Sequence, residues 1–284
     1  MLLSQLRSTF IKTLKPLYSE EEAQTVFNLL LAHYGSYTKQ DIAMKLWDHV
    51  PERILSEIHH ACNRLLAHEP VQYIIGHVAF SDLIINVSEA TLIPRPETEE
   101  LVSIILEELK REYANSEIHV LDIGTGSGCI AIALAKLNFT KVTAWDISSK
   151  ALQVAQKNAI QNKVSVNFEE VDILNIQAPK KAFNLIVSNP PYVLDAEKAV
   201  MQNRVLDFEP SQALFVPNNE PLLYYKAIIN WAIKGALSKN GVLWFEINET
   251  QGKPLVKHLK QMRFRKVQLL KDFLGKPRFI KASY

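Results

Sequence analysis

The arrangement of this chain follows from one stretch of sequence, Val120-Leu121-Asp122-Ile123-Gly124-Thr125-Gly126-Ser127-Gly128-Cys129. Its apolar first half predicts a buried strand, and its glycines predict a tight turn leading into a helix over residues 130–137. Glycine lets a ligand approach the backbone closely, and the first N–H groups of a helix have no partner within it. The Gly-x-Gly-x-Gly spacing is not that of a dinucleotide site, although such a turn alone does not separate NAD from S-adenosylmethionine.

Strands and helices alternate through this part of the chain. Strands are expected over residues 118–123, 141–145, 164–168, 183–188 and 241–247, and further helices over 149–162 and about 222–237. This alternation predicts an α/β, Rossmann-like fold with a mainly parallel sheet that helices cover on both faces. Two further strands are expected near the end of the chain over residues 264–270 and 278–282, and we expect them to be antiparallel.

Acidic residues lie at or near the ends of three successive strands. Asp146 ends the second strand, where an acid can hold both hydroxyls of a ribose. Asp172 follows the third strand, where a carboxylate can accept from an adenine amino group, and Asp122 is expected to face a cationic end of the ligand. A single acid at a strand end is usually only solvated, but ligands of parallel sheets bind at the carboxyl ends of the strands. The series therefore predicts a cofactor site.

The tetrapeptide Asn189-Pro190-Pro191-Tyr192 follows the fourth strand and indicates chemistry on a planar nitrogen. A nitrogen conjugated to a carbonyl or a π-system is a poor nucleophile, so the site must hold its NH2 group and accept hydrogen bonds from it. The Asn189 side-chain oxygen and the Pro190 carbonyl can be these acceptors, and the Tyr192 ring can form a flat wall. The prolines preorganise the loop. The structural alternative is a proline-rich turn after a buried strand.

The first part of the chain predicts a small helical bundle. Leu3, Leu6, Phe10 and Leu14 share one helical face, so we interpret the start as an amphipathic helix rather than a transit peptide. Ser19-Glu20-Glu21-Glu22 is a capping box that starts the next helix. Because this part contains no cofactor motif, a partner-recognition module or a structural cap is the simplest interpretation.

The character of the sequence changes after residue 69. Residues 71–76 and 83–87 predict a β-hairpin, so we divide the chain into a helical domain over 1–68, a hairpin linker over 69–91 and an α/β domain over 92–284. The segment that follows the hairpin predicts the start of a helix, with acids in its first turn. A helix start does not need Arg95 and Glu97, so we also predict that these two residues form a rigid edge near the active site, which we call the lip.

Composition restricts the class of protein. The 284 residues are 48% hydrophobic and 22% charged, as in ordinary globular proteins, and the net charge of +2 does not by itself indicate a nucleic-acid partner. Basic residues are concentrated between Lys253 and Lys281, where Asp272 is the one acid. Two distant cysteines favour a reducing, cytoplasmic compartment and disfavour a zinc site, and no apolar run has the length of a membrane span.

The order of these motifs resembles that of the release factor glutamine N5-methyltransferases of the HemK/PrmC type. The resemblance covers the whole chain. It rests on residues 70–76, on 92–99, on the glycine turn and on Asn189-Pro190-Pro191-Tyr192, and the second of these distinguishes it from most other enzymes with the tetrapeptide. It implies an S-adenosyl-L-methionine-dependent enzyme, a helical substrate-recognition domain and, as substrate, the glutamine of the Gly-Gly-Gln motif of class I peptide chain release factors. No metal is implied, and a monomer is the default expectation, with ribosome association through the substrate.

By position, the resemblance implies roles for individual residues. The methionine part of the donor would lie along the turn Gly124, Thr125, Gly126, Ser127 and Gly128. Asp146 would hold the ribose, Asp172 and Ile173 the adenine, and Asn189, Pro190, Pro191 and Tyr192 the glutamine amide. The chain departs from the family at Ile173, where many members have an aromatic residue, and at Asn248, where glycine is usual.

Two other classes of function remain open at this point. A nucleic-acid amino-methyltransferase acting on adenine or guanine would use the same tetrapeptide, with the base flipped out and stacked on Tyr192. On duplex DNA such an enzyme would need a basic recognition region, whereas the basic and acidic residues of 1–68 balance. A methyltransferase fold that only binds its ligands is the second alternative, and the intact Asn189 and strand-end acids argue against it.

Overall fold

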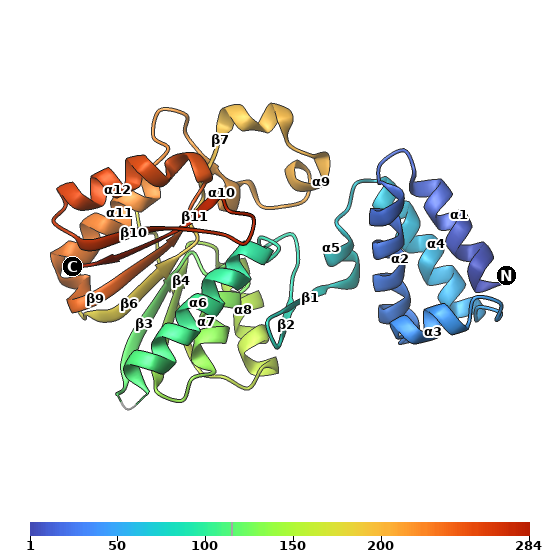
Figure 1. The fold of residues 1–284 in the computed structure, drawn as a ribbon, viewed down its shortest axis with the longest axis horizontal. Helices are drawn as coiled ribbons and strands as arrows, with labels where there is room; N and C mark the ends of the chain where they lie inside the picture. The colour runs from blue at the N-terminus through green and yellow to red at the C-terminus, as the bar shows by residue number, and fades with distance from the viewer. Residues whose placement is uncertain (115) are drawn as a thin grey trace. The chain divides into compact units, whose positions relative to one another are not determined.

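A computed structural model describes residues 1–114 and 116–284 and divides the chain into two compact units (Figure 1). The first unit contains Met1–Gly76 and Gln202–Phe208, and the second contains His77–Met201 and Glu209–Tyr284. None of the described helices combines the length and the apolar character that crossing a membrane requires.

The first unit is a helical bundle. Its helices are α1 (Leu3–Leu14), α2 (Glu20–Gly35), α3 (Lys39–Met44), α4 (Glu52–Leu66), α5 (Val71–Ile75) and the short α9 (Asn203–Leu206). The predicted amphipathic first helix is confirmed, since the four apolar residues of its face are buried in one core with those of α2 and α4. The predicted capping box is also confirmed, because Ser19 Oγ accepts from the Glu22 N–H and the Glu22 carboxylate from the Ser19 N–H.

The hairpin prediction is correct in its second strand and wrong in its first. Residues 71–75 form the helical turn α5, in which the N–H groups of Tyr73 and Ile74 donate to the Pro70 carbonyl, and Gly76 follows with φ +84°. A short apolar run of valine and isoleucine fits a buried helix as well as a strand, so its pattern did not distinguish the two. The antiparallel hairpin consists of β1 (His77–Phe80) and β2 (Leu83–Asn86).

The second unit contains a seven-stranded sheet in the order β10-β11-β9-β6-β3-β4-β5. Its strands are β3 (Ile118–Ile123), β4 (Thr140–Asp146), β5 (Val166–Glu170), β6 (Phe183–Ser188), β9 (Leu237–Glu246), β10 (Arg265–Lys271) and β11 (Pro277–Ser283). The first five are parallel, and β11 pairs antiparallel with both β9 and β10, as the sequence predicts. A separate parallel pair joins β7 (Val193–Leu194) and β8 (Phe215–Val216).

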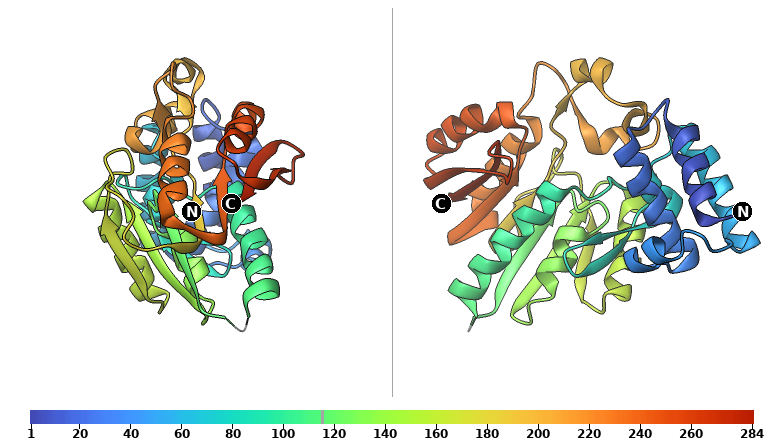
Figure 2. Two further views of the ribbon diagram at one scale, coloured as in Figure 1. Left: turned by 90° about the vertical axis from the view of Figure 1, so that its left-hand side faces the viewer. Right: turned by 45° about the vertical axis from the view of Figure 1, so that its right-hand side comes forward.

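Helices cover both faces of this sheet (Figure 2). On one face lie α6 (Pro96–Tyr113), α7 (Cys129–Ala135) and α8 (Ser149–Gln161), and on the other α11 (Leu223–Trp231) and α12 (Gly252–Gln261). The remaining elements are the π-helical turn η2 (Ala232–Ala236), the 3₁₀ helices η1 (Asp195–Val200) and η3 (Glu249–Gln251), and the short helix α10 (Ser211–Leu214). The α/β fold with a mainly parallel sheet is therefore confirmed.

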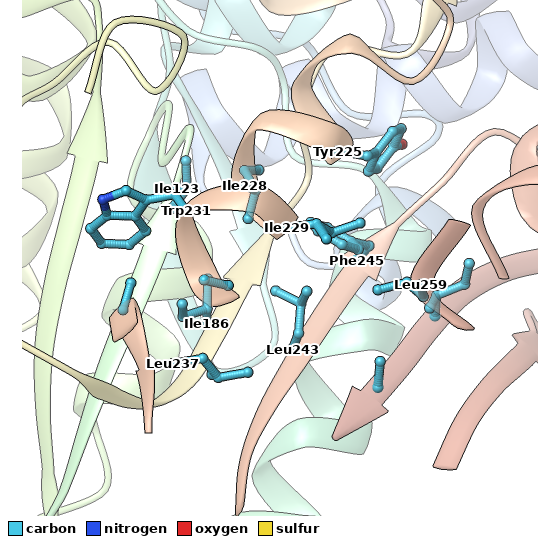
Figure 3. Close-up of a cluster of buried hydrophobic side chains, with 14 of the residues drawn as sticks. Ile123, Ile186, Tyr225, Ile228, Ile229, Trp231, Leu237, Leu243, Phe245 and Leu259 are labelled. Atoms are coloured by element: carbon cyan, nitrogen blue, oxygen red, sulfur yellow. The ribbon is translucent and has the colours of Figure 1, made fainter. Parts of the chain in front are cut away.

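The core between the sheet and α11 is built from alternate residues of the strands. Leu243 and Phe245 point from β9 to this face, where they meet Ile228 and Ile229 of the helix (Figure 3). All four side chains are fully buried. Because successive residues of a strand point to opposite faces, Trp244 and Glu246 of the same strand point toward α6.

Asn158 of α8 joins three segments that are distant in sequence. Its side chain is fully buried, and its Nδ2 donates to the carbonyl of Asn86 in the hairpin and to that of Ser127 in the glycine turn, each at 2.9 Å. Its Oδ1 accepts from the N–H and from Nδ2 of Asn86, each at 2.8 Å. One buried amide thus holds both the hairpin and the turn against α8.

We expect Asn158→Ala to lower the free energy of unfolding by roughly 2–4 kcal/mol, because it leaves a buried N–H and buried carbonyl groups without partners. Urea denaturation of purified protein measures this change. Gln156→Ala, on the exposed side of the same helix, is the matched control and is expected to change stability by less than about 1 kcal/mol. Equal unfolding midpoints for the two variants would contradict the role of Asn158.

Candidate active site

A pocket lies at the carboxyl ends of the parallel strands, where the ligands of such sheets bind. Its lining includes Gly124, Gly126, Asp146, Asp172 and Asn189, which the sequence placed there from separate motifs. Ile173, Pro190 and Pro191 line it as well. The lining does not include Thr125, Ser127, Gly128, Tyr192, Arg95 or Glu97. The predicted site residues thus fall into a set that faces the pocket and a set that supports it.

The glycine turn has a positive φ at each of its three glycines, +74°, +54° and +83° in chain order. A Cβ atom on Gly124 or Gly126 would meet nothing within 4 Å, so the space in front of both residues is open to a ligand. A Cβ on Gly128 would lie 3.0 Å from the Cβ of Ala155, so this glycine permits the close approach of α8.

The N–H groups of this turn are already engaged. Those of Gly124 and Thr125 donate to the Trp145 carbonyl at 2.8 and 2.9 Å, and that of Gly126 donates to Asp146 Oδ2 at 2.8 Å. These three N–H groups precede α7 and are not available to a ligand. The turn offers the ligand space beside the backbone, and its N–H groups hold the turn against β4.

Asp146 is positioned by two backbone donors. Besides the Gly126 N–H at Oδ2, the Ser148 N–H donates to Oδ1 at 2.9 Å. Burial raises the pKa of this carboxyl, and the hydrogen bonds from the backbone oppose that shift. A carboxylate oxygen can accept a second hydrogen bond, so the two oxygens can hold two neighbouring hydroxyl groups and be stabilised by them in the ionised form.

The far end of the pocket is apolar, with one acid at its rim. Asp172 accepts from the Leu174 N–H at 2.9 Å and from Asn175 Nδ2 at 2.6 Å, which holds it in a tight turn beside the buried Ile173. Tyr224 of α11 lines the same pocket, and the sequence analysis missed it. The helical pattern around residue 224 was visible, but it did not show which tyrosine faces the pocket and which, as Tyr225, is buried in the core.

The predicted position of Asp122 is wrong. Its side chain is fully buried on the α7 side of β3 and does not line the pocket. Asp122 Oδ2 accepts from Thr125 Oγ1 at 2.6 Å and from the Ala131 N–H at 3.2 Å, and burial raises the pKa of this carboxyl to about 7. This acid joins the glycine turn to the helix that follows it and does not face the ligand space.

Arg95, one of the two predicted lip residues, has a structural role. Arg95 Nη2 lies 2.6 Å from Oε1 of the buried Glu209, whose Oε2 accepts from the Ile93 N–H at 3.2 Å. Leu92, just before this segment, lines the pocket, whereas Arg95 and Glu97 do not. Asn248, whose role the sequence left open, accepts from the N–H and the hydroxyl of Thr250 at 3.0 and 2.8 Å and so caps η3.

Behind the tetrapeptide lies a polar cluster that the sequence analysis missed. Asn189 Nδ2 donates to Thr98 Oγ1 at 3.2 Å, and Thr98 Oγ1 donates to Glu246 Oε2 at 2.6 Å. Tyr192 donates through its hydroxyl to Glu246 Oε1 at 3.3 Å, and burial raises the pKa of this tyrosine. In the sequence, this cluster was indicated only by an acid, Glu246, at the end of the strand β9. The cluster fixes Asn189 at the pocket.

The pocket suits a nucleoside with a charged tail. Open space beside two glycines, an acid with spare acceptor sites, and apolar walls with a tyrosine ring match the backbone-near chain, the ribose and the base of such a ligand. A doubly covered parallel sheet with this pocket and an asparagine at the fourth strand end defines the Rossmann-like, class I S-adenosyl-L-methionine-dependent methyltransferases.

Comparisons with known proteins agree with this class. A model of the methyltransferase small domain matches residues 99–208, and a model of the PrmC N-terminal domain matches residues 5–76. Among solved structures, the human methyltransferase 10 domain containing protein matches with a TM-score of 0.51 and 19% identity, over 71% of this chain and 89% of that one. This likeness supports the fold alone.

Two curated relatives are similar over nearly their whole length. The release factor glutamine methyltransferase of Flavobacterium psychrophilum is 40% identical over 100% of both chains. The protein of the same name from Bacteroides thetaiotaomicron is 38% identical over 96% of each. The chain therefore belongs to the release factor glutamine methyltransferase family, and S-adenosyl-L-methionine is its methyl donor.

Proposed function

We propose that this enzyme transfers a methyl group to the side-chain amide nitrogen, N5, of the glutamine in the Gly-Gly-Gln motif of class I peptide chain release factors, and so modulates translation termination. The observation that carries the proposal is the position of Asn189, whose Nδ2 is held by Thr98 while its side chain lines the pocket. No hydrogen bond within residues 1–114 and 116–284 occupies its Oδ1. A carboxamide substrate offers the matching donors.

The roles of the pocket residues follow from what each can contact. Gly124 and Gly126 leave room for the methionine part of the donor, Asp146 accepts from the ribose hydroxyls, and Asp172 with Ile173 borders the base. Thr125, Ser127 and Gly128 support the turn from behind. When bound, S-adenosyl-L-methionine supplies a methyl group already activated by a sulfonium, so the protein needs no strong base.

In the proposed mechanism the protein binds the transition state through acceptors. As the amide nitrogen would form its bond to the methyl carbon, the carbon–sulfur bond would break to leave a neutral thioether, and the nitrogen would become more positive and its hydrogens better donors. One of these protons would then pass to solvent, which restores a neutral amide. Asn189 Oδ1 and the Pro190 carbonyl would therefore bind the transition state more tightly than the ground state. Pro190 and Pro191 restrict the loop, and alignment of the amide nitrogen with the methyl group supplies the remainder of the rate. Tyr192 would stabilise Asn189 and Glu246 from the side.

The helical unit supports recognition of a protein substrate. Met44 and Trp47, at and just after the end of α3, are 83% and 75% exposed, so both large apolar side chains are accessible to a protein partner. We propose that residues 1–68 recognise the release factor, that residues 69–91 link them to the methyltransferase domain over 92–284, and that the enzyme acts as a cytoplasmic monomer. Arg95 and Glu97 are proposed to border the substrate side of that domain.

We also propose that the basic residues of α12, of β10 and of the turn between them contact ribosomal RNA when the enzyme meets its substrate on the ribosome. These residues are exposed and make no ion pair within the described chain; they are Lys253, Lys257, Lys260, Arg263, Arg265, Lys266 and Lys271. The one acid in this part of the sequence, Asp272, is buried against Arg278. Lysines protect an edge strand such as β10 from aggregation, but this does not account for those on α12. RNA phosphates would neutralise them.

The first test is transfer of labelled methyl from S-adenosyl-L-methionine to a purified class I release factor. We expect label on the factor and none on its variant with Gln→Ala in the Gly-Gly-Gln motif, because the amide nitrogen is the acceptor. Equal label on both would place the reaction at another residue. Label on DNA or ribosomal RNA in place of either factor would support the base-methyltransferase alternative, which the balanced charge of the helical unit disfavours.

Asn189→Ala is expected to lower kcat about a hundredfold, because it removes an acceptor that acts mainly in the transition state. Affinity for S-adenosyl-L-methionine, measured by calorimetry on the same preparation, is expected to change little, since the glycine turn and Asp146 remain. Near-normal turnover of this variant would show that the mechanism is wrong.

Reversing two charges on α12, with Lys257→Glu and Lys260→Glu together, is expected to weaken co-sedimentation with ribosomes at least about tenfold and to reduce its salt dependence. The matched control reverses Lys150 and Lys157, two exposed lysines of α8. Methylation of the free release factor should be the same in both variants. Equal sedimentation of the two would refute an RNA-binding role for α12.

A further inference from the structure

The side-chain amide of Asn189 ends a directed chain of hydrogen bonds. Asn189 Nδ2 donates to Thr98 Oγ1, which lies 2.6 Å from Glu246 Oε2, and the other oxygen of this carboxylate accepts from Tyr192. Thr98 is 3% exposed and Glu246 is 1% exposed, and neither lines the pocket. This series of hydrogen bonds therefore lies behind the site, between α6 and β9, and reaches the pocket only at Asn189.

The donor and acceptor groups of these residues allow the series of hydrogen bonds only one direction. An ionised carboxylate has no proton and can only accept, so the single hydroxyl proton of Thr98 goes to Glu246. Thr98 Oγ1 is then an acceptor toward Asn189, and only the NH2 end of the asparagine amide satisfies it. A flipped amide would place Oδ1 against an oxygen whose proton is already engaged.

We propose that Thr98 and Glu246 are positioning residues that fix the direction of the Asn189 amide, so that its carbonyl oxygen faces the substrate nitrogen. The inference rests on the proposed function, in which Asn189 accepts from the glutamine NH2 group. It assigns a task to Thr98, a residue of the segment that begins α6. It also explains a buried acid at the end of β9 that touches neither the pocket nor a metal-binding cluster in the described chain.

The surroundings of Glu246 make this direction sensitive to pH. Burial raises the pKa of Glu246 to about 7, Glu97 also raises it, and the hydrogen bonds from Thr98 and Tyr192 together with the positive charge of Arg278 lower it. The hydroxyl of Tyr225 donates to the Glu246 carbonyl at 3.0 Å, and Arg278 Nη1 donates to the neighbouring Ile247 carbonyl at 3.3 Å. Once protonated, Glu246 can donate to Thr98, and Thr98 can then donate to Asn189.

Only ionised Glu246 fixes the direction of the Asn189 amide, so kcat is expected to depend on the ionisation of this carboxyl. The pKa of Glu246 is raised to about 7, so the directing form predominates above about pH 7 and is lost as the pH falls through that value. The kcat of the wild-type enzyme is therefore expected to decline on the acid side of neutrality. Glu246→Gln should remove this acid limb, because a neutral amide does not titrate there.

The decisive comparison uses two substitutions at Thr98. Thr98→Val keeps the shape and removes the hydroxyl, so it should lower kcat for the release factor about tenfold to a hundredfold while the affinity for S-adenosyl-L-methionine is kept. Thr98→Ser restores the hydroxyl and should recover most of the turnover. A role in packing α6 against β9 would instead make the serine variant the poorer of the two, since it is the one that loses a methyl group.

The outcomes separate this inference from the proposed function. If the wild-type enzyme does not methylate the release factor, the proposed function fails. If it does, and Thr98→Val has wild-type kcat, or Glu246→Gln keeps the acid limb, the positioning role is refuted. Calorimetric binding of S-adenosyl-L-methionine to each variant shows whether its pocket is folded. If Thr98→Val or Glu246→Gln does not bind the donor, the test compares Thr98→Ser with the wild-type enzyme across the same pH range. A serine variant with the kinetics and acid limb of the wild type supports the inference, and one without them overturns it.

Discussion

Parallel pairing of the central strands brings the residues of the candidate active site together. Ile123 of β3 is paired with Trp145 of β4 and with Ser188 of β6, and Ser188 is paired with Phe245 of β9. The residue after each of these positions therefore lies at the same edge of the sheet; these residues are Gly124, Asp146, Asn189 and Glu246. A shift of one strand by one residue would turn its functional side chain to the other face. The apolar strands thus set the geometry of the site through their register.

Much of this site could be predicted because each motif sits at a strand end. The glycine turn, Asp146, Asp172 and Asn189 all face one pocket, since the carboxyl ends of parallel strands converge in any sheet of this class. Thr98 and Glu246 are 148 positions apart in sequence and form their contact only after α6 has packed on β9. No local pattern indicates such a pair.

The failed predictions have a similar physical cause. The strand-end rule identified Asp122 as an acid near the turn, but it did not specify the face of β3 to which the side chain points. That face is covered by α7, so the carboxylate bonds the turn and the helix. The run from Val71 to Ile75 was apolar enough for either a helix or a strand, and only the tertiary contacts of the first unit select the helix.

Asp122 and Glu246 show how similar burial gives two different functions. Burial raises the pKa of both carboxyls to about 7, yet the partners of Asp122 belong to the turn and α7, whereas those of Glu246 lead to Asn189. A carboxylate at position 189 would stand near Glu246 in a poorly solvated site, and the repulsion would keep one of the two protonated. The neutral amide avoids this repulsion. In the proposed arrangement, the charge behind Thr98 directs an acceptor at the substrate nitrogen without adding a second charge to the pocket.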